Sequence, residues 1–205
     1  KDGMVDGEPV FLTKEKLAEK RRQMGPYIFS CQMLQNPVAE NMQGFREEWL
    51  NYYNKVKPAD MNIYILVDPA SSKKKYSDYT VMSVIGLGHD KNYYLLDMIR
   101  DKFNLTERTE ALFKLRQKWQ PRAVGYEKYS MQADIEYIKQ VQEENGIRFK
   151  VIPLGGNMAK IERIKRMVPL FEDGRFYIPK LITYLTNEGK KVNLIENFMY
   201  EYVNF

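Results

Sequence analysis

Two carboxylates, each at the end of an apolar segment, are the residues of this sequence best suited to chemistry. Asp68 ends the segment 61–68 (MNIYILVD), and Glu127 ends the segment 123–127 (AVGYE). Two carboxylates held close together repel each other, and a hard divalent cation removes that cost because it prefers oxygen ligands. Two such ions about 3.5–4 Å apart can clamp a phosphodiester for in-line attack by water. The pair therefore predicts a site for two Mg²⁺ or Mn²⁺ ions, with Asp68 and Glu127 as catalytic ligands.

Each of these acids also has a structural explanation. Asp68 precedes Pro69, and Asp-Pro commonly begins a turn, so Asp68 taken alone is also explained as a turn or cap residue. A charge at the end of a buried strand needs a partner, and Lys128 can supply one for Glu127 in a structural ion pair. The two acids together favour the metal site.

Two further aspartates lie near these segments. Asp78 precedes the apolar segment 79–87, and it either reaches the same metal ions or forms a turn with Tyr79 and Thr80. Asp97 interrupts an apolar run, where we expect a paired structural residue or the mark of an edge strand.

Basic residues beside the acids are candidates for binding the phosphates of a nucleic acid. The chain has 32 Lys and Arg against 27 Asp and Glu, and the net charge of +5 is compatible with a polyanionic partner. Lysines cluster in the loop 71–78, and the glycine turn 155–157 precedes a helix whose backbone N–H groups can bind phosphate. The lysine cluster is also explained as a solvated loop, and the glycines are also explained as an ordinary turn. The candidate nucleic-acid-binding residues are Lys73, Lys74, Lys75, Lys128, Lys160 and Arg163.

The composition excludes several classes of protein. With one cysteine, Cys31, and one histidine, His89, the chain has neither a disulfide framework nor a cysteine or multi-histidine metal site. We expect Cys31 to be a packing residue and His89 to lie at the surface. No segment approaches the roughly 18 apolar residues of a membrane span, no signal-type segment begins the chain, and no GxxxxGK[ST] motif indicates a P-loop ATPase site.

The apolar pattern alternates strands with helices. The expected strands are 61–68, 79–87, 93–99, 123–127 and 149–154. The expected helices are 105–119, 131–145, 159–172 and 193–203, with a short helix within 47–55 and a short extended piece at 175–178. Residues 1–60 are rich in Gly and Pro and are expected to form an irregular lead-in segment packed on a domain of residues 61–205.

This order of elements predicts a mixed α/β sheet. Three antiparallel strands come first, and the later alternation with helices implies parallel strands joined by right-handed crossovers. A mixed five-stranded sheet with helices on both faces is the pattern of the ribonuclease H-like fold. In it, the strands that end at Asp68 and Glu127 can lie side by side, which brings both acids to the end of the sheet where such folds bind ligands.

The sequence resembles the C-terminal nuclease domain of bacteriophage large terminase subunits, from about Phe11 to Phe205. The matching motifs are Phe29–Pro37 (FSCQMLQNP), Val67–Ala70 (VDPA), Ser77–Val81 (SDYTV), Tyr94–Asp97 (YLLD), Val124–Glu127 (VGYE), Lys160–Ile164 (KIERI) and Phe171–Arg175 (FEDGR). Each motif is loose alone, and their order and spacing together make the resemblance fairly specific.

This resemblance implies a nuclease that cuts concatemeric double-stranded viral DNA during genome packaging, by two-metal-ion hydrolysis with little sequence specificity. It implies that Asp68 and Glu127 are catalytic metal ligands, that Asp78 is a nearby ligand, and that Lys160 and Arg163 lie near the DNA. The implied partners are double-stranded DNA, an ATPase motor domain, a small terminase subunit and a portal. The implied location is the cytoplasm of the host cell.

The sequence departs from the family pattern at its ends. The family's third metal acid lies in an aspartate-rich motif shortly after the last helix, and this sequence stops at Phe205 before such a motif. The chain also begins at Lys1 without a Met, which suggests a fragment of a longer protein. We therefore expect the third ligand beyond Phe205, and no DNA translocation by a chain without the motor domain.

Three other functions are compatible with parts of the pattern. A Holliday-junction resolvase or transposase has the same fold and a different substrate, and the lead-in segment argues against it. A docking module for the portal or the motor would carry the acids as structural residues. A sugar-kinase-like or actin-like ATPase would need a glycine shortly after the first acid, and the residues after Asp68 (PAS) lack one.

Overall fold

The structure is a computed structural model that describes residues 4–5, 8–9, 13–24, 29, 32–33, 44–70, 78–127, 132–155 and 159–205. Its contacts divide the chain into two compact units. The sheet unit consists of Asn51–Asn157 and Phe176–Glu201, and the terminal unit of Lys1–Leu50, Met158–Arg175 and Tyr202–Phe205. The expected division into 1–60 and 61–205 stays a prediction.

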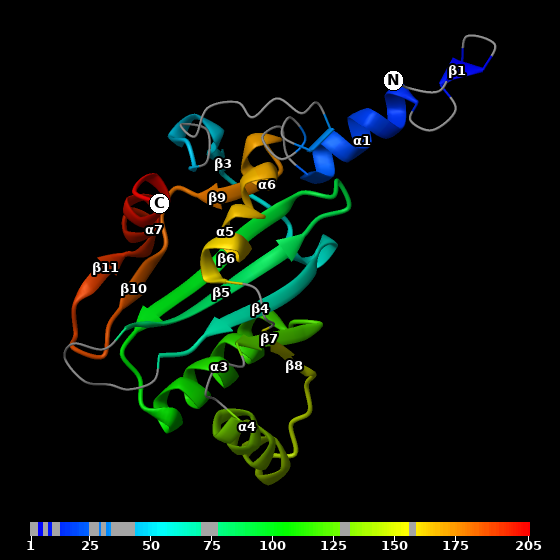
Figure 1. Cartoon of the computed structure of the whole chain (residues 1–205). Helices are drawn as coiled ribbons and strands as arrows, with labels where there is room; N and C mark the ends of the chain where they lie inside the picture. Colours follow the sequence, from blue (N-terminus) through cyan, green and yellow to red (C-terminus); the bar gives the residue numbers. More distant parts are fainter. Residues whose placement is uncertain are drawn as a thin grey trace. The chain divides into compact units, whose positions relative to one another are not determined.

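The sheet unit is built on a seven-stranded sheet of order β3-β9-β6-β5-β4-β7-β8 (Figure 1). The strands are β3 (Asn51–Tyr53), β4 (Asn62–Asp68), β5 (Thr80–Leu87), β6 (Tyr93–Asp101), β7 (Ala123–Glu127), β8 (Val151–Leu154) and β9 (Phe176–Pro179). Strand β5 is antiparallel to β4 and β6, and the other neighbouring pairs are parallel. Strands β4, β6, β7 and β8 therefore all finish at the same end of the sheet, where β5 begins.

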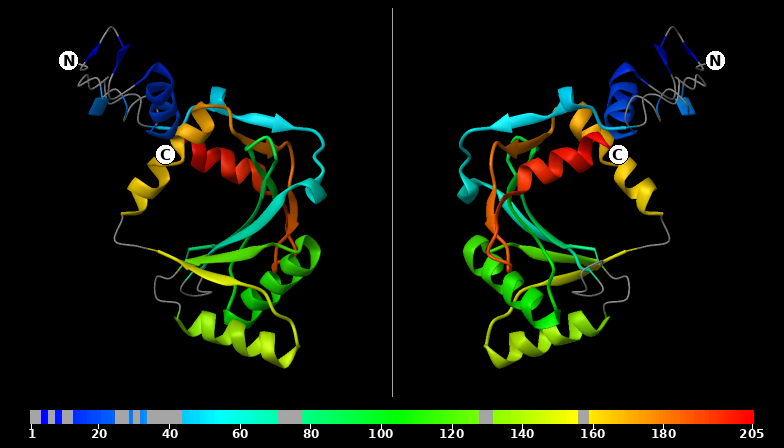
Figure 2. Two further views of the ribbon diagram at one scale, coloured as in Figure 1. Left: turned by 90° about the vertical axis from the view of Figure 1, so that its right-hand side faces the viewer. Right: turned by 90° about the vertical axis from the view of Figure 1, so that its left-hand side faces the viewer.

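Helices α3 (Leu105–Trp119) and α4 (Gln132–Glu144) cover one face of this sheet. Apolar residues of the strands and of both helices form one buried cluster on that face, including Ile65, Val67, Val124, Leu112 and Ile138. Helix α7 (Leu194–Val203) belongs to the sheet unit as far as Glu201, and this part lies on the opposite face (Figure 2). The expected ribonuclease H-like arrangement of sheet and helices is confirmed.

The sheet is larger than expected. The five predicted strands are β4 to β8 in the predicted order, and two short strands, β3 and β9, extend the sheet. The helix expected within 47–55 is wrong, because only Glu47–Trp49 form a 3₁₀ turn and the following residues are β3. Tyr52 and Tyr53 favour a strand, and pairing with β9 supplies their backbone hydrogen bonds. A hairpin of β10 (Thr183–Leu185) and β11 (Lys191–Asn193) was not expected.

The terminal unit contains helices α1 (Lys14–Met24), α5 (Lys160–Lys165) and α6 (Val168–Glu172), and the short hairpin of β1 (Met4–Val5) and β2 (Glu8–Pro9). The single helix expected over 159–172 is wrong. Arg166 and Met167 form a turn that separates α5 from α6, because Pro169 lacks the N–H that a continuous helix needs and its ring would clash with the preceding turn.

Aromatic side chains hold the terminal unit together. The rings of Phe45 and Tyr202 have centroids 4.8 Å apart, and those of Phe45 and Phe171 are 5.2 Å apart in an edge-to-face arrangement. The Tyr202 hydroxyl donates a hydrogen bond to the carbonyl of Arg46 at 3.0 Å. Within the described ranges of both units, no helix has the length and apolar character needed to cross a membrane.

Candidate metal and nucleic-acid site

The structure brings Asp68 and Glu127 to neighbouring positions. Strands β4 and β7 pair in parallel with Val67 opposite Tyr126, and the two acids are the next residue of each strand. Neighbouring strands lie about 4.8 Å apart. Side chains alternate along a strand, and Val67 and Tyr126 belong to the buried cluster, so both acids point to the opposite face of the sheet. Asp68 is exposed and Glu127 is half-buried.

Asp78 lies at the same end of the sheet, two residues before the first residue of β5, and it is exposed. We call the sheet end that carries Asp68, Asp78 and Glu127 the acid rim. In the part of the chain that the structure describes, no three His, Cys, Asp or Glu side chains gather closely enough to hold a metal ion. The roles of Asp68, Glu127 and Asp78 as metal ligands therefore stay predictions.

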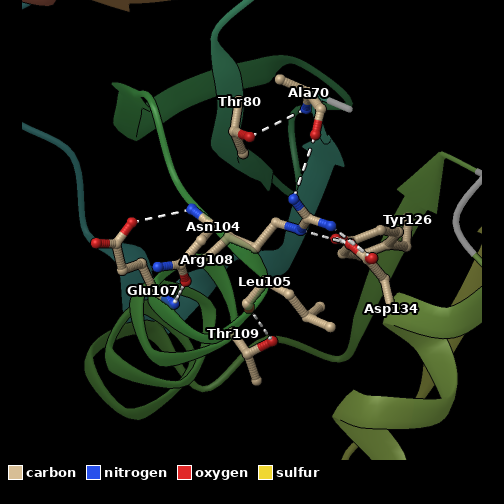
Figure 3. A network of polar contacts seen from close by, with 9 residues as sticks. All are labelled: Ala70, Thr80, Asn104, Leu105, Glu107, Arg108, Thr109, Tyr126 and Asp134. Atoms are coloured by element: carbon tan, nitrogen blue, oxygen red, sulfur yellow. Dashed lines mark hydrogen bonds and ion pairs between the residues drawn. The ribbon is translucent and has the colours of Figure 1, made fainter. Parts of the chain in front are cut away.

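Figure 3 shows a buried ion pair between Arg108 and Asp134, next to Tyr126 and Ala70. Nε and Nη2 of Arg108 in α3 each donate to one oxygen of Asp134 in α4, both at 2.5 Å. The hydroxyl of Tyr126 donates to the same carboxylate at 2.5 Å. Burial, followed by the hydrogen bond and charge of Asp134, raises the pKa of Tyr126, so this hydroxyl keeps its proton. The Asp134 carboxylate thus joins both helices to β7.

The same network reaches the backbone on either side of the acids. Arg108 Nη1 donates to the carbonyl of Ala70 at 3.2 Å, and the Ala70 N–H donates to the buried Thr80 hydroxyl at 3.0 Å (Figure 3). Ala70 is two residues after Asp68, Tyr126 is one residue before Glu127, and Thr80 is two residues after Asp78. This hydrogen-bond network therefore reaches the chain within two residues of each of the three acids.

Sequence reasoning missed this network, although the sequence contains a signal for it. Arg108 and Asp134 each lie four residues before a fully buried apolar residue, Leu112 and Ile138 respectively. They therefore occupy the inward-facing stripe of their helices. Two opposite charges at inward positions of consecutive helices predict a buried ion pair.

An apolar surface adjoins the acids. Leu66 of β4 and Leu154 of β8 lie over Gly125, and a Cβ atom on Gly125 would lie 3.0 Å from Leu66 Cδ2 and 2.6 Å from Leu154 Cδ1. The two leucines are 44% and 38% exposed. Gly125 therefore lets both side chains close over the strand immediately before Glu127.

Two other strand acids have structural partners. Asp97 accepts hydrogen bonds from Lys118 Nζ at 2.7 Å and Trp119 Nε1 at 2.8 Å, which confirms the expected paired structural residue. Asp101 ends β6 at the acid rim, and the sequence analysis did not single it out because the third strand was expected to stop at Ile99. Its carboxylate is buried and accepts from Tyr184 Oη and the Asn187 N–H, so it anchors the β10–β11 hairpin.

The structure describes only some of the predicted phosphate-binding residues. Lys73, Lys74, Lys75 and Lys128 lie outside the described residues, as does Cys31. Lys160 and Arg163 belong to α5 in the terminal unit, where Lys160 is exposed and Arg163 is half-buried. His89 is exposed in the β5–β6 turn, as expected.

The fold and the paired strand-end acids define a ribonuclease H-like domain. Residues 65–199 match the model of a protein family described as "Terminase RNaseH-like domain", which is more than half of the 205-residue chain. The chain belongs to this family. A comparison with curated protein sequences gave no match.

Among solved structures, the chain is similar to the large terminase nuclease from thermophilic phage G20c, with 19% identity over 70% of this chain and 82% of that chain and a TM-score of 0.46. A structure of that nuclease with bound magnesium has 18% identity over 74% and 87% of the chains and a TM-score of 0.47. The large terminase of bacteriophage HK97 has 10% identity over 92% of this chain and 47% of that chain, with a TM-score of 0.45.

Proposed function

We propose that this domain is a divalent-metal-dependent endonuclease that cuts concatemeric double-stranded DNA during viral genome packaging. The observation that carries the proposal is the position of Asp68 and Glu127 on adjacent parallel strands, at the same end and on the same face of the sheet. Membership of the terminase ribonuclease H-like family supports it.

The residues at the acid rim fit hard divalent ions such as Mg²⁺ or Mn²⁺. Asp68 and Glu127 offer carboxylate oxygens to such ions and need no histidine or cysteine. When bound, two ions would lower the pKa of an attacking water and stabilise the leaving oxygen of a phosphodiester. Asp78 is proposed as a further ligand, and a third family acid beyond Phe205 stays a prediction.

Other residues are proposed to hold the acids in place or to contact DNA. The Arg108–Asp134 pair keeps the acid-bearing strand ends in one arrangement, which limits the freedom of both carboxylates. We propose that Lys73, Lys74, Lys75, Lys128, Lys160 and Arg163 contact phosphates, which attract DNA without regard to its sequence. In the whole protein, the ATPase motor domain, the small terminase subunit and the portal are proposed partners.

Cleavage of supercoiled plasmid tests the proposal. We expect nicking and linearisation with Mn²⁺ or Mg²⁺, none with EDTA, and a loss of at least about 100-fold in rate for D68N and E127Q. D60N is the matched control, because Asp60 is an exposed aspartate before the opposite end of β4, and it should cut normally. Cutting by D68N and E127Q at the wild-type rate would contradict the proposal and favour a docking module.

A further inference from the structure

A cation lies in the same cross-strand row as the two acids. Asp68 of β4 is opposite Val81 of β5, and Val81 is opposite Arg100 of β6. Directly opposed residues point to the same face of a sheet, so Arg100 shares the face of Asp68 and Glu127. Two strand spacings separate the backbones of Asp68 and Arg100, which is about 10 Å. Arg100 therefore belongs to the acid rim, on the side away from Glu127.

Two cationic side chains near this position lie over the exposed ring of Tyr79. The guanidinium carbon of Arg100 lies 3.9 Å from the ring centroid of Tyr79, and Lys102 Nζ lies 5.1 Å from the same centroid. Tyr79 is 43% exposed and directly follows Asp78. Stacking on the ring limits the motion of the guanidinium, which lowers the entropy cost of binding an anion.

An acidic side chain already contacts this arginine. Arg100 Nη2 lies 3.1 Å from Glu201 Oε1, and the Arg100 and Glu201 side chains are 25% and 66% exposed, so water reaches the pair from the Glu201 side. Ion pairs at exposed sites are weak, because water and salt screen them. A phosphate, which accepts two parallel hydrogen bonds from a guanidinium, can therefore replace the Glu201 carboxylate.

We propose that Arg100, stacked on Tyr79 and assisted by Lys102, binds a backbone phosphate of the DNA strand held at Asp68 and Glu127, and that Glu201 occupies Arg100 until DNA displaces it. One strand of a duplex has one phosphate per about 3.4 Å of helix axis, so a phosphate within a few nucleotides of the one held at the acids can reach Arg100. The inference rests on the proposed nuclease function. It adds a phosphate contact and a competing carboxylate to that site.

Two variants are expected to change DNA affinity in opposite directions. The measurement is fluorescence anisotropy of a labelled mixed-sequence duplex in EDTA, over a series of NaCl concentrations. R100Q should bind about five- to tenfold more weakly, and its slope of log K against log salt should be smaller by about 1, since one phosphate contact is lost. E201Q should bind about two- to fivefold more tightly, because the competing ion pair is gone.

Matched variants separate these effects from net charge. R116Q removes another arginine that lies over a ring, Phe149, from helix α3 on the opposite face of the sheet. E144Q removes an exposed glutamate from α4 on that same face. Both controls should change affinity less than twofold, a difference of about 0.4 kcal/mol. R100K keeps the charge, so it should keep the salt slope while losing part of the affinity.

The outcomes distinguish this inference from the proposed function. If the wild type cuts plasmid with Mn²⁺ while R100Q keeps the wild-type affinity and salt slope, the phosphate contact is wrong and the nuclease stands. If E201Q binds no more tightly than E144Q, the competing role of Glu201 is wrong. If the wild type neither binds nor cuts DNA, both proposals fail. Circular dichroism of each variant checks that it is folded.

Discussion

Asp134 is a buried carboxylate whose two oxygens accept three hydrogen bonds, two from Arg108 and one from Tyr126. The Arg108 and Asp134 side chains are 7% and 4% exposed. At such a site each charge depends on the other, because neither is solvated by water. We therefore expect this residue to contribute both to the stability of the sheet unit and to the placement of the strand ends that carry the acids.

Replacing this carboxylate with an amide should be costly. We expect D134N to lower the free energy of unfolding by about 3–5 kcal/mol, because it leaves the Arg108 charge buried without a counter-charge. Urea denaturation at neutral pH measures the change. K190Q removes one partner of an exposed pair whose side chains are 75% and 76% exposed, and should cost less than about 1 kcal/mol. Equal losses for the two variants would contradict the buried-pair account.

At the scale of residues, the sequence showed only in part which strand-end acids are exposed at the candidate site and which are buried structural residues. Asp68, Glu127 and Asp101 all end strands at one end of the sheet. Asp101, however, faces the interior, where its carboxylate accepts hydrogen bonds from Tyr184 and Asn187. Which face an acid occupies depends on register, and a shift of one residue reverses it. The partners of Asp101 come from a hairpin distant in the sequence, so no local pattern shows them.

At the scale of elements, helix α3 carries Arg108 and depends on how it begins. The Asn104 side chain accepts from the Glu107 N–H at 2.9 Å, and the Glu107 carboxylate accepts from the Asn104 N–H at 2.9 Å. This capping box satisfies two backbone donors that the first turn otherwise leaves unpaired. It fixes the start of the helix one turn before Arg108.

Removing the cap should weaken α3 without touching the buried pair. We expect N104A to lower the free energy of unfolding by about 1 kcal/mol, which is typical of a lost N-cap. Thermal or urea unfolding measures it. N104D keeps an acceptor at the same position and should retain most of the stability. A loss in N104D as large as in N104A would show that the side-chain oxygen is not the stabilising group.

The turn between β5 and β6 should make stability depend on pH. The Tyr94 hydroxyl donates to Asp90 at 2.6 Å. Burial and this hydrogen bond raise the pKa of Tyr94 from 10.0 to about 12. A tyrosine whose pKa is raised in the folded state stabilises the protein below its unfolded pKa, and that contribution is lost as pH rises through the folded value. Stability should therefore fall between about pH 10 and 12.

Urea unfolding across this range checks the assignment to the turn. Y94F should lose less stability than the wild type between about pH 10 and 12, because it lacks the group that titrates. Tyr53, whose pKa burial also raises to about 12, remains in both proteins and leaves part of the fall in place. Parallel pH profiles for Y94F and the wild type would contradict a role for Tyr94.

Helices and strands with a regular apolar pattern could be predicted from the sequence, and very short strands and helices could not. Strands β4 to β8 and helices α3 and α4 have apolar patterns long enough to determine their type. The three residues of β3 form a strand because β9, more than 100 residues away, pairs with them. The break between α5 and α6 follows from Pro169, a signal that the apolar spacing of 159–172 outweighed in our prediction.

At the scale of the sheet unit, one topology explains why the candidate site forms where it does. Strand β5 reverses direction between β4 and β6, so the ends of β4, β6 and β7 meet the start of β5 at a single end of the sheet. That end carries the acid pair and, two strands from Asp68, Arg100. The proposed metal ligands and the proposed phosphate contact therefore lie at one end of the sheet, a combination suited to a phosphodiester.

Our proposal that Asp68 and Glu127 together hold divalent ions is tested most directly by calorimetric titration of Mn²⁺ in the absence of DNA. We predict that the wild type and the D60N control bind Mn²⁺, and that D68N and E127Q each weaken binding by at least about tenfold, since each replaces an anionic carboxylate with a neutral amide that has a single oxygen. Mn²⁺ binding of wild-type strength by both D68N and E127Q would contradict the claim.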